Sequence, residues 1–249
     1  MVIWVLSISR RHTGPGIAPR WGLLLVGLWM GGLLGCPSPG PPRAGLPEAG
    51  PAAVALLRQQ AVQGAQEAQY RLGLLALTGK GVPHDMSAAV QWLQRAAAQG
   101  HPEAQRLLGQ LSLTGQGLPR NATAAAAWYR RAAVQGDPEA QWQLGRLYQT
   151  GQGVPRNEAE AATWCHRAAA HGDPERQWHL GLKYLHGWGV PQDSVQAYLW
   201  LSLAATHLPS GPLRVQATRA SRQAAQKMTP AQWTRAQALV RQWPSQTTP

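Results

Sequence analysis

The chain contains few side chains that could carry out nucleophilic or metal chemistry, and their spacing favours neither. Cys165 and His166 are adjacent, so on a helix their side chains point about 100° apart, which does not suit a nucleophile and its general base. The eight histidines lack the spacing of zinc ligands, and we interpret the group formed by His166, His171, His179 and His186 as a fortuitous surface cluster. We therefore predict no catalytic residue, no metal site and no cofactor. Four glutamates recur near the start of a predicted helix, which indicates capping rather than acid–base catalysis: Glu67, Glu103, Glu139 and Glu175.

The second cysteine, Cys36, stands where a lipid could be attached. It follows an apolar stretch, residues 21–34, whose 14 residues are too few for an ordinary membrane span of about 20 and suit the core of a signal peptide. The sequence Leu33-Leu34-Gly35-Cys36 resembles a bacterial lipobox. The resemblance implies that residues 1–35 are a lipoprotein signal peptide and that Cys36 is lipidated. An ordinary signal peptide and an uncleaved anchor are the alternatives.

A lipid on Cys36 would hold the mature chain at a membrane of the bacterial cell envelope. The acyl chains would be buried in the bilayer, and the proline-rich residues 36–50 would form an extended tether. Proline rather than aspartate follows Cys36, and in Gram-negative lipoproteins this resemblance favours the outer over the inner membrane. We therefore expect a lipid-anchored protein that faces the periplasm.

Most of the remaining chain is organised by a repeat of 36 residues, marked by the pattern Gly-x-Gly-Val/Leu-Pro. The pattern follows predicted helices, and its proline stands where a phosphate-binding loop would need N–H groups, so we interpret it as a turn. A fixed period of this size is typical of a solenoid. The four copies lie at residues 79–83, 115–119, 151–155 and 187–191.

Each repeat predicts two helices. In the third repeat Asp137, Pro138 and Glu139 suit the N-cap and first turn of the first helix. A glycine recurs in the middle of this helix, where it costs roughly 1 kcal/mol against alanine, so we expect a close helix–helix contact there. These glycines are Gly73, Gly109, Gly145 and Gly181.

The second helix is predicted to begin two residues after the proline, at an Asp or Asn that can cap it. Its apolar residues recur at i, i+3, i+4 and i+7 around a tryptophan, which indicates one buried face. Cys165 occupies a position of this face, so we expect it to be a small buried apolar side chain. The N-caps are Asp85, Asn121, Asn157 and Asp193, and the tryptophans are Trp92, Trp128, Trp164 and Trp200.

These motifs together, Ala-Gln-x-x-Leu-Gly, Gly-x-Gly-Val-Pro-x-Asp/Asn and Ala-x-x-Trp-x-x-x-Ala-Ala, resemble the Sel1-like repeat family, whose members are relatives of tetratricopeptide repeat proteins. The resemblance implies an all-α, right-handed solenoid of four helical hairpins that acts as an adaptor or scaffold. A capping helix over residues 51–63 would place Leu56 in the tryptophan register and Ala61 in the alanine register. The hairpins would occupy residues 64–99, 100–135, 136–171 and 172–207, and C-terminal capping helices residues 208–245.

In related helical solenoids the first helix of each repeat lines the concave face, so its non-core positions are the candidate partner-binding residues. One register combines aromatic residues with arginine, which is the composition of an interaction hot spot. Packing of these aromatics between neighbouring repeats is an equally weighted alternative. The candidates are Tyr70, Arg106, Gln110, Trp142, Arg146, Gln149 and Trp178, with Trp188 in a loop.

The charge of the chain favours acidic partners. The formal net charge is +12, and removing Arg10, Arg11 and Arg20 of the leader leaves +9 (12 − 3). Anionic lipid, acidic polysaccharide and acidic protein surfaces would all match this charge, although a basic scaffold without such a ligand fits as well. Nucleic acid is disfavoured, because no recognition motif or dense basic run is present.

These features predict a non-enzymatic, membrane-tethered scaffold for protein–protein interactions in an envelope complex. One alternative is a scaffold in polysaccharide secretion that binds an acidic polymer or its machinery. A cell-wall hydrolase-like enzyme, as reported for disulfide-bearing relatives, is disfavoured because the chain has no Ser-x-x-Lys motif.

Overall fold

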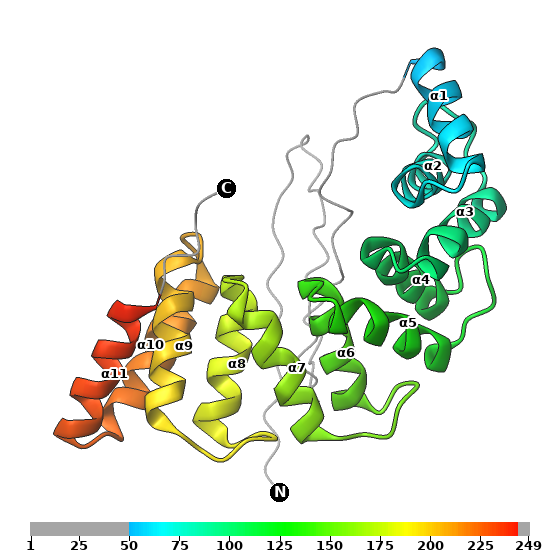
Figure 1. The fold of residues 1–249 in the computed structure, drawn as a ribbon. Coiled ribbons are helices and arrows are strands. Elements are labelled where there is room, and N and C mark those ends of the chain that lie inside the picture. The colour runs from blue at the N-terminus through cyan, green and yellow to red at the C-terminus, as the bar shows by residue number, and fades with distance from the viewer. Residues whose placement is uncertain (1–49, 244–249) are drawn as a thin grey trace, which may run out of the picture. The chain divides into compact units, whose positions relative to one another are not determined.

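The computed structural model describes residues 50–243, which form eleven α-helices and no β-strand (Figure 1). The predicted signal peptide and Cys36 lie outside these residues. No helix within them is long and apolar enough to cross a bilayer. The helices are α1 (Pro51–Val62), α2 (Gln66–Thr78), α3 (Met86–Ala98), α4 (Pro102–Thr114), α5 (Ala122–Val134), α6 (Pro138–Thr150), α7 (Glu158–Ala170), α8 (Pro174–His186), α9 (Ser194–His207), α10 (Pro212–Gln226) and α11 (Pro230–Gln242).

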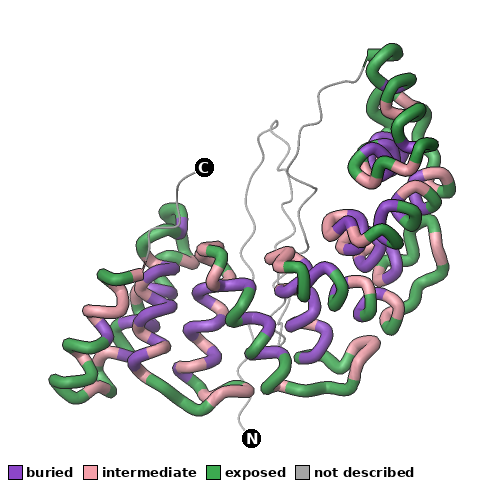
Figure 2. The backbone as a smooth tube through the Cα atoms, viewed as in Figure 1, coloured by how far each residue is buried: buried purple, intermediate pink, exposed green. Residues whose placement is uncertain are grey.

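The helices pair into four hairpins, which confirms the predicted all-α repeat fold. Each hairpin consists of a first helix (α2, α4, α6 or α8) and a second helix (α3, α5, α7 or α9). The second helices α3, α5 and α7 also pack on the first helix of the next hairpin, and α9 packs on α10 and α11. Buried residues run through every hairpin between these helices (Figure 2). The core is therefore continuous along the row, and no hairpin buries its apolar face alone.

The recurring mid-helix glycine brings the two helices of each hairpin together. A Cβ atom on Gly73 would lie 2.9 Å from Cγ of Leu93, and one on Gly181 would lie 2.6 Å from Cγ of Leu201. Cys165 takes the equivalent place over Gly145 and is buried, which confirms its predicted role as a small core residue. The predicted close contact is thus present, and its packing compensates for the low helix propensity of glycine.

The turn within each hairpin has the predicted chemistry. In the third repeat Gly151 ends α6 in the left-handed conformation, with φ 72°, and its N–H donates to the carbonyl of Leu147. The side chain of Asn157 then caps α7 by accepting hydrogen bonds from the N–H groups of Ala159 and Glu160. These local signals fix where the first helix ends and where the second begins.

A ladder of buried glutamines joins each hairpin to the one before it. Gln105 donates from Nε2 to the carbonyl of Ala97 at 3.1 Å, near the end of the preceding second helix, where helical partners for carbonyls run out. Its Oε1 accepts a hydrogen bond from Gln135 at 2.8 Å. The other three ladder glutamines donate in the same way: Gln69 to Ala61, Gln141 to Ala133 and Gln177 to Ala169.

The ladder is incomplete in the third and fourth repeats. His171 occupies the position of Gln99 and Gln135, and no donor within residues 50–243 reaches Oε1 of Gln141. Oε1 of Gln177 is in the same state. An unsatisfied buried amide oxygen lowers stability, so these two interfaces are less well completed than the first two.

The N-terminal helix α1 behaves as a second helix whose outer side is open within the described residues. Ala61 is buried, as its alanine register predicts, but Leu56 is 56% exposed. The tryptophan register of Leu56 therefore does not bring burial, because no described hairpin lies beyond α1. The neighbouring Leu57 instead packs at the edge of the cluster that contains Ala61 and Trp92.

The C-terminal helices close the other end of the row, and the sequence of α9 changes to receive them. The first three repeats place an arginine over the ring of their tryptophan, as Arg131 does 4.6 Å above Trp128. In α9 this arginine is replaced by Leu203, which packs in a cluster with Trp200 and Leu239 of α11. Thus α11 covers an apolar face that is charged in the earlier repeats.

Candidate interaction surface on the first helices

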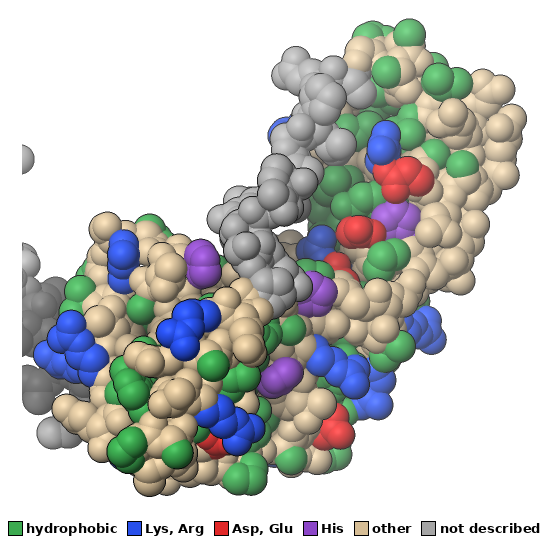
Figure 3. Space-filling view, turned by 60° about the vertical axis from the view of Figure 1, so that its left-hand side comes forward, with side chains coloured by type: hydrophobic (Ala, Val, Ile, Leu, Met, Phe, Trp, Pro, Cys, Tyr) green, Lys and Arg blue, Asp and Glu red, His purple; other side chains and the backbone are tan. Residues whose placement is uncertain are grey.

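The first helices share one surface, because polar and aromatic side chains link each of them to the next. The candidate residues Tyr70, Arg106, Trp142 and Trp178 occupy the same repeat position in α2, α4, α6 and α8. The first three are half-buried and Trp178 is buried. Figure 3 shows acidic, basic and histidine side chains interspersed with hydrophobic ones on the face that it presents.

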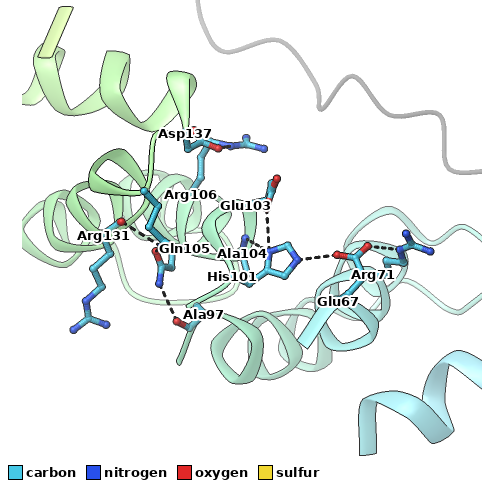
Figure 4. A network of polar contacts seen from close by, with 11 residues as sticks. Glu67, Arg71, Ala97, His101, Glu103, Ala104, Gln105, Arg106, Arg131 and Asp137 are labelled. Atoms are coloured by element: carbon cyan, nitrogen blue, oxygen red, sulfur yellow. Dashed lines mark hydrogen bonds and ion pairs between the residues drawn. The ribbon is translucent and has the colours of Figure 1, made fainter. Parts of the chain in front are cut away.

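Tyr70 lies against the start of the next first helix. Its ring stacks on that of His101, with ring centres 4.4 Å apart and 27° between the planes. Nε2 of His101 lies 2.9 Å from Oε2 of Glu67, and Nδ1 lies 3.1 Å from Oε2 of Glu103 (Figure 4). The hydrogen bond with His101, reinforced by Arg71, lowers the pKa of Glu67 below its ordinary value of 4.5 against the opposing effect of burial. The ring of Tyr70 is therefore held between two repeats.

Arg106 is fixed by the N-cap of the following first helix. Its Nε lies 3.1 Å from Oδ2 of Asp137 (Figure 4). The other carboxylate oxygen of Asp137 accepts a hydrogen bond from the N–H of Ala140. Both side chains are mostly shielded from water, so this ion pair is less screened than one on an open surface. The guanidinium of Arg106 thus has a defined position, and its Nη groups remain as further hydrogen-bond donors.

A second polar chain joins the third and fourth repeats and ends at Arg146. Nη2 of Arg176 lies 2.6 Å from Oε2 of Glu139, and Oε1 of Glu139 accepts from Gln143. Oε1 of Gln143 in turn accepts from Nη1 of Arg146 at 3.2 Å. Sequence analysis missed Arg176, although it stands at a position where the first three repeats have alanine.

His179 separates the two tryptophans of the candidate register. Its ring centre lies 5.2 Å from that of Trp142 and 4.5 Å from that of Trp178. Burial, together with the positive charges of Lys183 and Arg146, lowers the pKa of His179 from 6.5 to about 4. The imidazole is therefore neutral at neutral pH, which allows it to pack between aromatic rings.

Trp178 is not part of the exposed surface. It is 9% exposed and packs in a cluster with Ala217 and Ala220 of α10. Trp178 is therefore a packing residue, but the helix that covers it is the capping helix α10 rather than a neighbouring repeat, whereas Trp142 keeps more of its side chain accessible. The expectation that both tryptophans face a ligand is corrected on this point.

A buried charge lies beneath the surface, at a position that sequence analysis did not single out. Lys183 stands where the first three repeats have leucine, and it is 5% exposed. Its Nζ lies 3.9 Å from Oε2 of Glu158 in α7. Two repeats earlier, the equivalent residues are Met86 and Leu111, which belong to a single apolar cluster. A charged pair has thus replaced an apolar pair.

The remaining candidates differ in accessibility. Gln110 is half-buried and Gln149 is exposed. Trp188 is 44% exposed and stacks on His186, with ring centres 4.6 Å apart. We define the first-helix surface as the accessible candidates that lie on the linked first helices, which are Tyr70, Arg106, Gln110, Trp142, Arg146 and Gln149. Half-buried aromatic rings beside positioned guanidinium groups are suited to binding a protein surface.

Comparison with known proteins places these features in a family. The Sel1 repeat matches residues 66–101, 102–137, 138–173 and 175–207. A Sel1 repeat protein from Oxalobacter formigenes has a similar structure, with 34% sequence identity and a TM-score of 0.62 over 69% of this chain and 49% of that one. A protective antigen of uropathogenic Escherichia coli with an SLR fold is 33% identical, with a TM-score of 0.61 over 69% of this chain and 41% of that one. The present chain thus spans less than half the length of either structure, and no curated protein matches it.

Proposed function

Because the chain belongs to the Sel1 repeat family, we propose that it is a non-enzymatic scaffold that binds protein partners through the first-helix surface. Sel1-repeat proteins generally mediate protein–protein interactions, and their solenoid is typically not catalytic. The proposal concerns which surface of this chain carries that role.

One observation supports the first-helix surface above the others. Its aromatic and arginine side chains remain accessible although the tryptophans of the second helices are used in packing or stacked with arginine. Trp142 and Arg146 lie one turn apart on α6, in the combination that dominates protein-binding hot spots.

The surface is also held in place before any partner binds. Asp137 fixes Arg106, Gln143 fixes Arg146, and His179 supports the ring of Trp142. Side chains that are already ordered lose less conformational entropy on binding, so each contact contributes more to affinity.

We also propose that the scaffold is tethered through a lipid on Cys36 to the periplasmic side of a bacterial envelope membrane, the outer membrane in preference to the inner. The support is the lipobox-like sequence that ends at Cys36 and the proline-rich stretch after it. Radiolabelled fatty acid should label the wild-type chain and not the Cys36→Ala variant. Cys165→Ala, which removes the other cysteine, should remain labelled, and equal labelling of all three proteins would refute the tether.

The scaffold is tested by cross-linking in cells, with the tagged full chain as bait. Trp142→Ala and Arg146→Ala should each lose partners that the wild type recovers. Arg131→Ala removes an exposed arginine from a second helix and is the matched control, which should recover partners in wild-type amounts. If both first-helix variants keep wild-type melting temperatures and recover every partner undiminished, the first-helix surface is not the binding site.

A further inference from the structure

The C-terminal end of the helix row is basic without any compensating acid. Residues 194–243 contain six Lys and Arg side chains and no Asp or Glu, whereas residues 50–193 contain thirteen basic and ten acidic ones. Figure 3, in which this end of the row comes forward, shows Lys and Arg side chains spread over it. The six are Arg214, Arg219, Arg222, Lys227, Arg235 and Arg241.

Half of these charges gather around one hollow along α10. The hollow has a volume of about 860 Å³, and Arg214, Arg219 and Arg222 line it together with Val215 and Thr218. Val215 is 63% exposed, so the hollow has an apolar patch between its guanidinium groups. We call this surface the α10 hollow.

The arginines of the α10 hollow differ from Arg106 and Arg176 of the first helices in having no internal counter-charge. Arg106 is paired with Asp137 and Arg176 with Glu139, but no carboxylate within residues 50–243 forms an ion pair with Arg214, Arg219 or Arg222. Arg219 and Arg222 are three residues apart on the helix, a spacing at which like charges repel. A negatively charged ligand would remove this repulsion and make use of all three groups.

We propose that the α10 hollow binds an acidic peptide segment of a partner protein, with its carboxylates on the three arginines and an apolar side chain on Val215. Guanidinium groups match carboxylates in a bidentate geometry, and the residues that line the hollow all come from α10 and the turn before it, so one peptide segment can reach all three arginines along a single helix. A flat lipid surface fits less well, since membrane-binding helices present large apolar residues such as Trp, Phe or Leu beside their basic ones, and the outward face of α10 presents Val215 alone among large apolar side chains. The α10 hollow is separate from the first-helix surface and does not depend on its function.

Fluorescence anisotropy with the full chain tests this proposal. The probe is a fluorescein-labelled decapeptide with six glutamates flanking a central leucine, and a peptide with glutamine in place of each glutamate is its control. The triple variant Arg214→Gln/Arg219→Gln/Arg222→Gln should bind the glutamate peptide at least tenfold more weakly than the wild type. The matched variant Arg120→Gln/Arg235→Gln/Arg241→Gln removes three exposed charges elsewhere and should keep most of the wild-type affinity.

The outcomes separate the α10 hollow from general electrostatics and from lipid. Equal weakening by the two triple variants, or equal binding of the two peptides, would show that no specific acidic-peptide site exists. In sedimentation with phosphatidylglycerol vesicles, the two variants should behave alike. A selective loss of vesicle binding by the α10 variant would assign the hollow to lipid and overturn the proposal.

Discussion

Nζ of Lys183 lies 3.9 Å from Oε2 of Glu158, inside an interface where an earlier pair of hairpins places Met86 and Leu111. The lysine is almost fully buried, whereas Glu158 is one-third exposed and also bonds to Arg156. An ion pair of this kind stabilises little, because removing an ammonium group from water offsets most of the attraction. The main effect of the pair is that the interface between α7 and α8 contains charged groups where the interface between α3 and α4 is apolar.

Replacing the whole pair should therefore be tolerated better than replacing half of it. Glu158→Met leaves the ammonium of Lys183 buried without its carboxylate and should lower the free energy of unfolding by about 2 kcal/mol. Glu158→Met combined with Lys183→Leu restores the earlier apolar pair and should be at least as stable as the wild type. Urea unfolding followed by circular dichroism measures both, and a double variant less stable than the single one would contradict this account.

The glutamine ladder predicts a stabilising substitution. His171→Gln would place a donor where Gln135 stands one repeat earlier, so Oε1 of Gln141 would gain a hydrogen bond. One such bond is worth about 1 kcal/mol, and the gain should appear as a higher urea midpoint. Gln135→His, the reverse change, should destabilise by a similar amount through the loss of the bond to Gln105. The same sign of effect for both substitutions would be inconsistent with the ladder.

The close contact at the mid-helix glycine predicts that replacing this glycine by alanine lowers stability, although alanine has the higher helix propensity. Gly181→Ala should raise helix propensity by about 1 kcal/mol, but its Cβ would lie 2.6 Å from Cγ of Leu201, and such overpacking costs about 1–3 kcal/mol. We expect net destabilisation in thermal melting. Because Leu201→Ala makes room for the new methyl group, the double variant should lose less stability than the sum of the two single variants. Simple additivity would show that the contact is looser than the structure indicates.

The low pKa of His179 predicts how stability depends on pH. The imidazole titrates near 6.5 when unfolded and at about 4 when folded, so the unfolded chain binds more protons in between. The contribution of His179 is complete above pH 6.5 and is lost as the pH falls toward 4. His179→Gln, which copies Gln143 of the preceding repeat, should flatten the stability profile in this window. A variant that loses as much stability as the wild type between pH 6.5 and 4 would exclude His179 as the cause.

Local signals made the hairpins predictable. The left-handed Gly151, the cap at Asn157 and the glycine at 145 each act through neighbouring residues or one recurring contact, so their spacing along the chain contains the information. The repeat also allowed equivalent positions of the first helices to be assigned from the sequence, because Tyr70 and Trp142 occupy the same position of the repeat.

The pairing between hairpins was not predictable in the same way. Arg176 and Lys183 are visible as departures from alanine and leucine, but their partners Glu139 and Glu158 lie in other helices and follow from how the hairpins pack. Trp142 and Trp178 occupy the same position of the repeat but differ in exposure, because α10 covers Trp178. The repeat pattern alone contains no information about α10.

The apolar face that α9 presents to α11 also determines where this array could grow. A fifth unit added after α9 would displace α11 and leave Leu199 and Leu203 facing water. A duplicate of residues 100–135 inserted after residue 135 would have a repeat on either side, and the packing of α10 and α11 on α9 would be unchanged. Lengthening of this protein, by recombination or by engineering, is therefore expected to proceed from within the array.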